Sequence, residues 1–353
     1  MKKIMHVAEP FATGVLSFLI DLTNQQVETY EIYILYGQRD LTPDHVEEQF
    51  DKRIHLIRID SFRGALGSVV NPRAYVDINR WYRRIRPDIV HLHSSASGFI
   101  GRWAIDCGRT KVFYTPHGYS FLAGNGSRAK RLLFRGIEKV STWRRSTTIA
   151  CSKGEYEEAR KLTSRCTYIN NGINLKLLDP YVRDIEEVQQ PLRICTSGRI
   201  LTQKNPTLFN RIALLLPDAR FTWIGEGELA SELTASNIRI TGWISRKETL
   251  EILNSSDFFI LPSLWEGLPI ALLEAMYMKK ICLVSNVIGN RDVIRSGCNG
   301  MICESAEEFA EAIRGLGRDS PQGARLAEAA HLDVKTNYSL ERMAQAYNEI
   351  YNA

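Results

Sequence analysis

Short apolar runs alternate with stretches of helical periodicity along the first half of the chain. The apolar runs predict strands at residues 3–8, 32–36, 54–59, 88–93, 112–115 and 147–151, and the periodic stretches predict helices at 14–24, 73–85, 99–107 and 128–143. Short, continuous apolar runs are typical of strands that are buried on both faces. Their alternation with helices predicts a parallel sheet that is covered by helices on both sides.

The alternation lapses at residues 179–191 and then starts again. This stretch carries two prolines and many charged residues with little periodicity, so it is predicted to be a linker. Beyond it, strands are predicted at 192–197, 221–224, 238–241, 258–261 and 281–283, and helices at 206–216, 246–254 and 270–278. The predicted fold class is therefore α/β, with two doubly wound, Rossmann-like domains at residues 1–178 and 192–338.

Composition and charge narrow the class of protein. The 353 residues are 44% hydrophobic and 24% charged, which is ordinary for a soluble chain of about two domains. The seven cysteines are scattered without metal-binding spacing and are expected to be reduced thiols. No signal peptide precedes the first strand and no apolar run could span a bilayer, so a cytoplasmic location is expected. Residues 1–180 hold 27 Lys and Arg against 18 Asp and Glu, which favours an anionic ligand or surface on that half.

Residues suited to binding a diphosphate follow the predicted strands of the second half. Ligands of open parallel sheets bind at the carboxyl ends of strands, and Arg199 and Lys204 lie just after the first of these strands. Both side chains suit phosphate oxygens, although two solvated surface cations would look the same. Gly225 follows the next strand and allows either a close backbone approach or a plain turn. Trp243 and Ile244 follow the third strand, where a base could rest against them, or Trp243 could instead fill the core.

The strongest signal lies between the strand at 258–261 and the helix after it. Glu266 and Gly267 stand in a short loop, and Pro269 stands where the helix begins. Free amides and the dipole at such a helix start suit a diphosphate. Glu274 lies within the otherwise apolar helix, so its carboxylate needs a partner, for which the hydroxyls of a sugar or ribose would serve. The alternatives are a favourable helix-terminal charge for Glu266 and a structural hydrogen bond for Glu274.

The same segment resembles the hallmark of a large enzyme family. Glu266 and Glu274 form an E-x7-E pattern similar to that of the retaining GT-B glycosyltransferases, which include bacterial polysaccharide enzymes and sucrose and glycogen synthases. Other stretches resemble motifs of this family in the same order: Pro87 to His93, Thr115 to Gly118, Ala150 to Ser152, Ile169 to Asn174 and Tyr338 to Tyr351. The chain departs from the family at Ala12-Thr13-Gly14, where many members have G-G, and at Asp292, where many have Glu.

The resemblance implies a two-domain architecture and a set of residue roles. The two domains would face a cleft, and residues 339–353 would form a helix that packs back on the first domain. Pattern and resemblance together make the candidate donor-binding residues Gly14, Arg199, Lys204, Gly225, Trp243, Ile244, Glu266, Gly267, Leu268 and Glu274. By the resemblance, Arg199 and Lys204 would hold the donor diphosphate and Glu274 the ribose. Glu266 would hold the transferred sugar and His117 would face it from the other domain, which makes these two the candidate catalytic residues.

The predicted function is retaining transfer of a sugar from a nucleotide sugar, expected to be a UDP-sugar, without a metal or cofactor. Since no D-x-D motif stands in a suitable loop, Arg199, Lys204 and helix amides would neutralise the leaving diphosphate. The expected acceptor is a glycan or a lipid-linked glycan of bacterial surface polysaccharide synthesis, and no nucleic acid is expected as a partner. Two alternatives stay open: a GT-B nucleotide-sugar epimerase, and a catalytically silent sugar-binding or assembly partner. A dehydrogenase is disfavoured because no G-x-G-x-x-G follows the first strand.

The stretch from Ser127 to Ser146 is strongly basic. It holds seven Lys and Arg residues against a single acid, Glu138, with apolar residues between them. It could be a peripheral helix that presses on an anionic membrane surface. It could equally be a helix that packs its apolar face on the domain and leaves its cations in solvent. Lipid-linked acceptors are common among the bacterial members of the family that this chain resembles, which favours the first interpretation, a helix on a membrane surface.

Overall fold

The computed structural model describes residues 1–39, 42–122, 127–183, 191–317 and 321–353. Two compact units share the chain: one consists of Met1–Asn171 with Leu340–Ala353, and the other of Gly172–Ser339. The start of the predicted linker, residues 179–183, belongs to the second unit, and residues 184–190 lie outside the described part of the chain. Within the described residues, no helix combines the length and the apolar character needed to cross a membrane.

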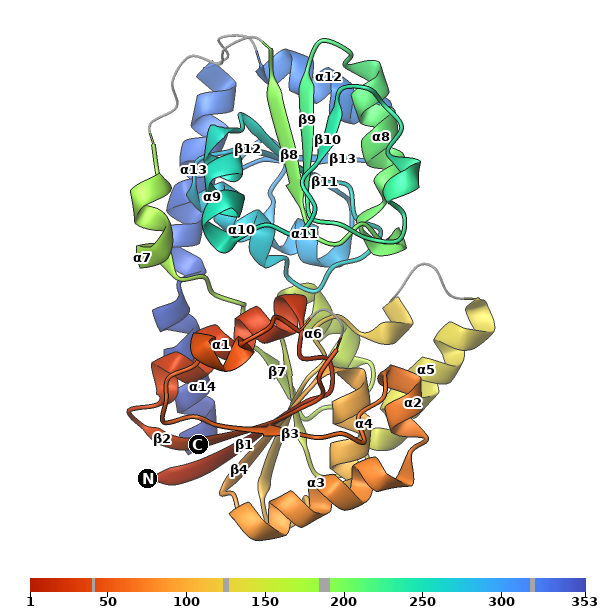
Figure 1. Cartoon of the computed structure of the whole chain (residues 1–353), viewed down its shortest axis with the longest axis vertical. Helices are drawn as coiled ribbons and strands as arrows, with labels where there is room; N and C mark the ends of the chain where they lie inside the picture. The colour runs from red at the N-terminus through yellow and green to blue at the C-terminus, as the bar shows by residue number, and fades with distance from the viewer. Residues whose placement is uncertain (40–41, 123–126, 184–190, 318–320) are drawn as a thin grey trace. The chain divides into compact units, whose positions relative to one another are not determined.

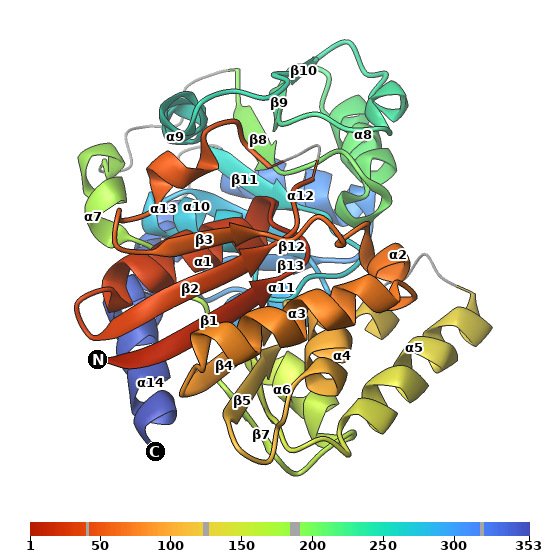
Figure 2. The same cartoon turned by 60° about the horizontal axis from the view of Figure 1, so that its bottom comes forward.

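The first unit is built on a seven-stranded sheet with helices on both faces (Figures 1 and 2). Its strand order is β3-β2-β1-β4-β5-β6-β7, and these neighbours pair in parallel. The strands are β1 (Lys2–Ala8), β2 (Tyr30–Tyr36), β3 (His55–Arg58), β4 (Ile89–His93), β5 (Lys111–Thr115), β6 (Thr147–Ala150) and β7 (Cys166–Tyr168). The helices are α1 (Thr13–Gln26), α2 (Ala65–Val69), α3 (Pro72–Ile85), α4 (Ser94–Ala104), α5 (Arg128–Ser141), α6 (Lys153–Arg160) and α14 (Leu340–Asn352).

Side chains of β1 alternate between two cores, one on each face of this sheet. Ile4 and Ala8 join the core that contains α1 and α14, whereas Met5 and Val7 join the core that contains α3 and α4. This alternation follows from the two-residue period of a strand. The C-terminal helix α14 packs against α1 and adds the buried rings of Tyr347 and Tyr351 to the first core.

The second unit repeats the design on a six-stranded sheet (Figure 1). Its strand order is β10-β9-β8-β11-β12-β13, again with parallel neighbours. The strands are β8 (Arg193–Ser197), β9 (Arg220–Ile224), β10 (Ile238–Ile240), β11 (Phe258–Leu261), β12 (Ile281–Ser285) and β13 (Met301–Cys303). The helices are α7 (Leu175–Leu178), α8 (Pro206–Leu215), α9 (Arg246–Ser255), α10 (Ile270–Tyr277), α11 (Ile288–Val293), α12 (Ala306–Leu316) and α13 (Pro321–Asn337).

These two sheets confirm the predicted α/β class with two doubly wound halves. In both sheets the strand order reverses beside the first strand of the unit, at β1 between β2 and β4 and at β8 between β9 and β11. Such a reversal opens a crevice outside the carboxyl ends of the strands, where ligands of this class of fold bind. The site residues are therefore sought at these edges.

Candidate functional site

An ion pair joins the loops that follow β8 and β11 in the second unit. Lys204 ends a short 3₁₀ turn after β8, and its Nζ lies 2.6 Å from Oε1 of Glu266 in the loop after β11. The Lys204 side chain is 16% exposed and that of Glu266 is 7% exposed, so the pair is largely shielded from solvent. The hydroxyl of Ser263 donates to the same oxygen at 2.6 Å, and Nε2 of Gln203 lies 3.4 Å from Oε2. The carboxylate is thus fully engaged within this unit.

Arg199 is held much more loosely. Its Nη2 lies 2.7 Å from Oε1 of Glu228, whose side chain is 74% exposed. A pair in water contributes about 0–1 kcal/mol to stability. Arg199 can therefore turn to a phosphate at little cost, whereas Lys204 must leave a shielded carboxylate to do so.

Glu274 has a partner that the sequence analysis did not identify. Arg246, the first residue of α9, directs both terminal nitrogens at the two carboxylate oxygens, with Nη1 3.0 Å from Oε2. The expectation that this buried carboxylate depends on donor hydroxyls for a partner is wrong, because a planar guanidinium fork already satisfies it. The only sequence signal was a cation directly after the helix-capping Ser245.

Close backbone contacts bring the loops of this edge together. A Cβ on Gly225, whose φ is 133°, would lie 2.5 Å from the carbonyl oxygen of Gly198 after β8. A Cβ on Gly289 of α11 would lie 2.1 Å from the carbonyl oxygen of Gly267, next to Glu266. Since a side chain fits at neither position, both glycines are needed for the close approach of these loops. Leu268, which follows Gly267, is buried beneath the same loop.

Trp243 lies at the surface, with 53% of it exposed. The alternative that Trp243 fills the core is wrong; the core tryptophan of this unit is Trp223, which is fully buried and donates from Nε1 to the carbonyl oxygen of Gly198 at 2.7 Å. Ile244 beside it is half-buried. Trp243 is therefore available to a ligand.

The two candidate residues of the first unit lie at the carboxyl edge of its sheet. Gly14 is exposed in the first turn of α1, and this helix begins without a side-chain cap at Ala12. His117 follows β5 with a left-handed φ of 54° and is half-buried. Its Nε2 lies 3.1 Å from Nδ1 of His93, and burial lowers its pKa to about 3. His117 is accordingly neutral at physiological pH.

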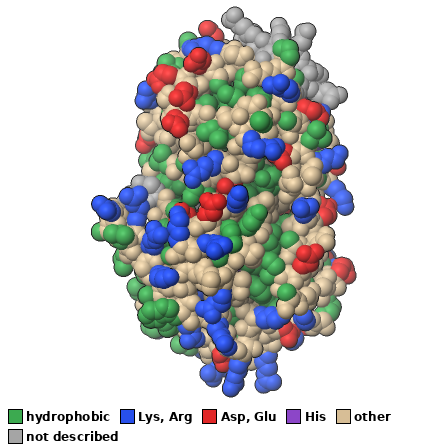
Figure 3. Space-filling model, turned by 180° about the vertical axis from the view of Figure 1, so that it is seen from behind, with side chains coloured by type: hydrophobic (Ala, Val, Ile, Leu, Met, Phe, Trp, Pro, Cys, Tyr) green, Lys and Arg blue, Asp and Glu red, His purple; other side chains and the backbone are tan. Residues whose placement is uncertain are grey.

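The basic stretch forms helix α5, which is exposed over most of its surface. Leu132 and Leu133 are each 62% exposed, and Trp143 beyond its end is also exposed. The alternative that this helix packs its apolar face on the domain holds in part: Phe134 packs against the core that contains α3 and α4, whereas Leu132 and Leu133 do not. In Figure 3, hydrophobic and basic side chains stand next to each other at the edge of the first unit where α5 lies.

Chemically, the edge of the second sheet offers cations that can exchange partners. Lys204 and Arg199 are each paired with a carboxylate, so a ligand diphosphate would compete with Glu266 and Glu228 for these two cations. Glu266, once released, can accept from hydroxyl groups of a ligand.

Comparison with known proteins agrees with this architecture in both halves. Residues 12–177 match the family model described as Glycosyltransferase Family 4, and residues 191–319 match the one described as Glycosyl transferases group 1. The chain is 30% identical over 346 residues to the Escherichia coli UDP-Gal:alpha-D-GlcNAc-diphosphoundecaprenol alpha-1,3-galactosyltransferase, with 88% of this chain and 87% of the relative covered. It is 26% identical to the N,N'-diacetylbacillosaminyl-diphospho-undecaprenol alpha-1,3-N-acetylgalactosaminyltransferase of Campylobacter jejuni, with 91% of each covered.

Solved structures share the fold over the whole chain. The sucrose-phosphate synthase of Thermosynechococcus elongatus superimposes with a TM-score of 0.84 at 14% identity, covering 100% of this chain and 98% of its own. Anabaena HepE in complex with UDP and glucose gives a TM-score of 0.81 at 16% identity, with 100% of both chains covered. These likenesses confirm the GT-B fold class.

Proposed function

Because this chain belongs to the group 1 and family 4 glycosyltransferases, we propose that it transfers a sugar from a UDP-sugar to a hydroxyl of a lipid-linked glycan. That it is a glycosyltransferase follows from the family. The donor is proposed because HepE, a fold neighbour, was solved with UDP and glucose, and the E. coli relative is named for UDP-Gal. The acceptor is proposed because two relatives are named for sugar acceptors on diphosphoundecaprenol. Such acceptors fit the synthesis of a bacterial surface polysaccharide.

The observation that carries the proposal is the pairing of Lys204 with Glu266 at the edge of the second sheet. Without a donor, the lysine that would hold the diphosphate is neutralised by the carboxylate that would hold the sugar. A bound diphosphate would draw Lys204 to itself and free Glu266 for the sugar hydroxyls. A single change of partner would thus give both the contact of Lys204 with the diphosphate and that of Glu266 with the sugar. Arg199 would also bind the diphosphate after leaving its exposed partner Glu228.

The leaving diphosphate would be stabilised by fixed cations and helix amides rather than by a metal. The contacts of Lys204 and Arg199 strengthen as negative charge develops on the departing phosphate, which lowers the barrier rather than only the KM. Glu274 would bind the ribose hydroxyls after Arg246 moves away from its carboxylate, or while both bind that carboxylate together. The front-face, retaining course implied by the family would let the leaving phosphate take the acceptor proton, so no protein nucleophile is assigned.

The acceptor side of the proposal includes contact with a membrane surface. Helix α5 presents Leu132, Leu133 and Trp143 to solvent beside the basic side chains of the stretch from Ser127 to Ser146. Cations next to exposed apolar groups suit an anionic lipid surface, where the apolar groups insert and the cations meet headgroups. This arrangement would place the enzyme where a lipid-linked acceptor lies.

A donor screen tests the proposal. The purified chain is incubated with UDP-, GDP- and dTDP-sugars, with and without a polyprenyl-diphosphate-linked glycan, and released nucleotide is measured. We expect release of UDP that depends on the acceptor, and its loss in the Lys204→Ala variant. UDP release, or interconversion of the sugar, that needs no acceptor would instead favour the epimerase, and binding of every donor without turnover would favour the silent partner.

A further inference from the structure

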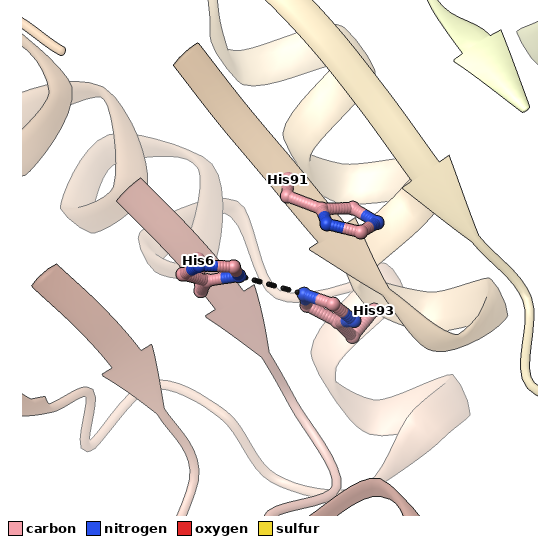
Figure 4. Close-up of side chains that lie close together, drawn as sticks. All are labelled: His6, His91 and His93. Atoms are coloured by element: carbon pink, nitrogen blue, oxygen red, sulfur yellow. Dashed lines mark hydrogen bonds between the residues drawn. The ribbon is translucent and has the colours of Figure 1, made fainter. Parts of the chain in front are cut away.

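Four buried or half-buried histidines lie beside one another at the carboxyl edge of the first sheet. His6 belongs to β1, His91 and His93 to β4, and His117 follows β5. Figure 4 shows the ring of His6 directed at that of His93, and the distance between Nδ1 of His6 and Nε2 of His93 is 3.0 Å. The other ring nitrogen of His93, Nδ1, lies 3.1 Å from Nε2 of His117. Three imidazoles thus form one hydrogen-bonded chain, His6–His93–His117.

His91 lies outside this chain. Its Nδ1 lies 2.6 Å from the hydroxyl of Tyr351 and its Nε2 lies 2.8 Å from that of Thr115. Ring nitrogens of His6, His91 and His93 lie within 4.8 Å of one another, as in a metal site. Hydrogen bonds already use both ring nitrogens of His91 and of His93, however, so this cluster is better described as a hydrogen-bonded network.

A chain of neutral imidazoles can carry its protons in only two arrangements. Each neutral ring has one N–H and one bare nitrogen, so if one ring donates to the next, every ring in the chain must donate in the same direction. The rings are neutral because burial lowers the pKa of His6 and of His117 to about 3 and that of His93 well below its ordinary value. The neighbouring titratable groups are His91, Tyr347 and Tyr351 of α14, and Glu155 of α6, which accepts from the amide of Gly118 at 2.6 Å.

The inner end of the chain decides between the two arrangements. Nε2 of His6 is buried and meets no hydrogen-bond partner within the described residues. Leaving a buried N–H without an acceptor is rarer and costlier than leaving a lone pair without a donor. His6 is therefore expected to carry its proton on Nδ1 and to donate to His93, which in turn donates from Nδ1 to His117. The proton of His117 is then on Nδ1, the ring nitrogen that does not face His93.

We propose that His6 and His93 are positioning residues that fix His117 as the tautomer with its proton on Nδ1, so that His117 offers a hydrogen-bond donor, rather than an acceptor, to an oxygen of a ligand at the carboxyl edge of the first sheet. The identity of that oxygen rests on the proposed function, whereas the tautomer does not. A fixed neutral donor favours a hydroxyl oxygen or a developing negative charge without adding a positive charge of its own. The ability of His117 to donate a hydrogen bond is thus determined by His6, which lies two rings away in the chain His6–His93–His117.

The direct test is the tautomer of each histidine in the whole chain, labelled with ¹⁵N-histidine. Two-bond ¹H–¹⁵N correlations distinguish a proton on Nδ1 from one on Nε2 without any turnover. We expect His6, His93 and His117 all to be protonated on Nδ1 from pH 5 to 8. A proton on Nε2 of His117, or titration of His117 near its ordinary pKa, would overturn the proposal whether or not the chain transfers sugar.

Two substitutions of one residue separate positioning from simple packing. In His93→Asn the amide can still reach His117, whereas in His93→Gln it can still reach His6 instead. We expect His93→Gln to mix the tautomers of His117 and to lower kcat about tenfold with little change in the donor KM, as loss of one hydrogen bond allows. His93→Asn keeps a hydrogen-bond partner for His117 and should lower kcat less than His93→Gln does, although its amide can turn either its NH2 group or its oxygen to His117 and so fixes the tautomer less firmly than His93. Equal effects of the two variants would contradict the proposal.

A matched control lies two residues away on the same strand. His91→Gln disturbs an equally buried ring whose hydrogen bonds go to Tyr351 and Thr115 rather than to the chain His6–His93–His117. It should leave the Nδ1 signal of His117 unchanged even if the domain becomes less stable. A shift of His117 to mixed tautomers in this variant would show that general loosening, rather than the chain His6–His93–His117, controls the ring. If the tautomers are as expected but no sugar is transferred, the proposed function fails and the tautomer assignment stands.

Discussion

Replacing Lys204 by Ala should weaken both donor binding and the second unit itself, because we propose that Lys204 binds the donor and its pair with Glu266 stabilises the unit. The side chains are 16% and 7% exposed, so removal of the lysine leaves a shielded carboxylate without its cation. Breaking such a pair from one side costs about 3–5 kcal/mol when it is fully buried. Ser263 and Gln203 still donate to Glu266, so we expect a loss of about 3 kcal/mol, at the lower end of that range.

Arg199→Ala is the matched control for this prediction. Arg199 would hold the same diphosphate, but its partner Glu228 is 74% exposed, so its loss should cost under about 1 kcal/mol of stability. Both variants should reduce donor turnover strongly, yet only Lys204→Ala should destabilise the unit. Adding Glu266→Gln to Lys204→Ala should restore most of the stability without restoring turnover, since the unpaired charge is then gone.

Native-state hydrogen exchange measures this difference within one unit of a two-unit chain, where a single unfolding transition is not assured. The amides of β8 and β11 report the opening free energy of the sheet beside the pair. Equal opening free energies for Lys204→Ala and Arg199→Ala would refute the reasoning, as would a double variant less stable than Lys204→Ala. Near-normal turnover in both single variants would refute the site assignment.

Three further predictions test the remaining residues. Glu266→Gln and His117→Ala should mainly lower kcat. Glu274→Gln should mainly raise the donor KM, because contacts to the ribose would be the same in the ground and transition states. Steady-state kinetics with the opposite pattern would contradict the roles proposed for these three residues. EDTA should leave activity largely intact, since we propose that Lys204 and Arg199 neutralise the diphosphate, and loss of activity that Mg²⁺ or Mn²⁺ restores would overturn this. Replacing four basic residues of α5 by Glu should weaken binding to anionic vesicles in a flotation assay, and added salt should do the same to the unmodified chain. The four residues are Arg128, Lys130, Arg131 and Arg135. Vesicle binding that changes with neither would count against membrane contact.

The central strands were predictable from sequence because burial on both faces leaves a continuous apolar run. All of Phe258–Leu261 is buried, and the predicted and observed bounds of this strand agree. The edge strands Cys166–Tyr168 and Met301–Cys303 were missed, since each has three residues and is partly exposed, which leaves no run to detect. Periodicity alone did not detect helix α6 for a related reason: its eight residues carry several charges and little apolar periodicity.

The candidate site was predictable as a set of residues but not as a set of pairs. Arg199, Lys204 and Glu266 stand after strand ends, and parallel strands bring those ends to one edge. Which carboxylate meets which cation depends on loop conformation, and Lys204 and Glu266 are separated by 62 positions in the chain. Arg246 was missed because its role appears only when α9 lies beside Glu274 of α10. The histidine chain was equally hidden, since β1, β4 and β5 become neighbours only in the folded sheet.

Proton NMR of one reaction mixture tests the central claim most directly. The chain, a UDP-sugar and a polyprenyl-diphosphate-linked glycan are followed together, so that UDP release and the anomeric signal of the new linkage are read in the same sample. The account predicts one new glycosidic linkage for each UDP released, with the anomeric configuration of the donor retained and no reaction without acceptor. An inverted linkage would contradict the retaining course, and consumption of the donor without any new linkage would contradict sugar transfer itself.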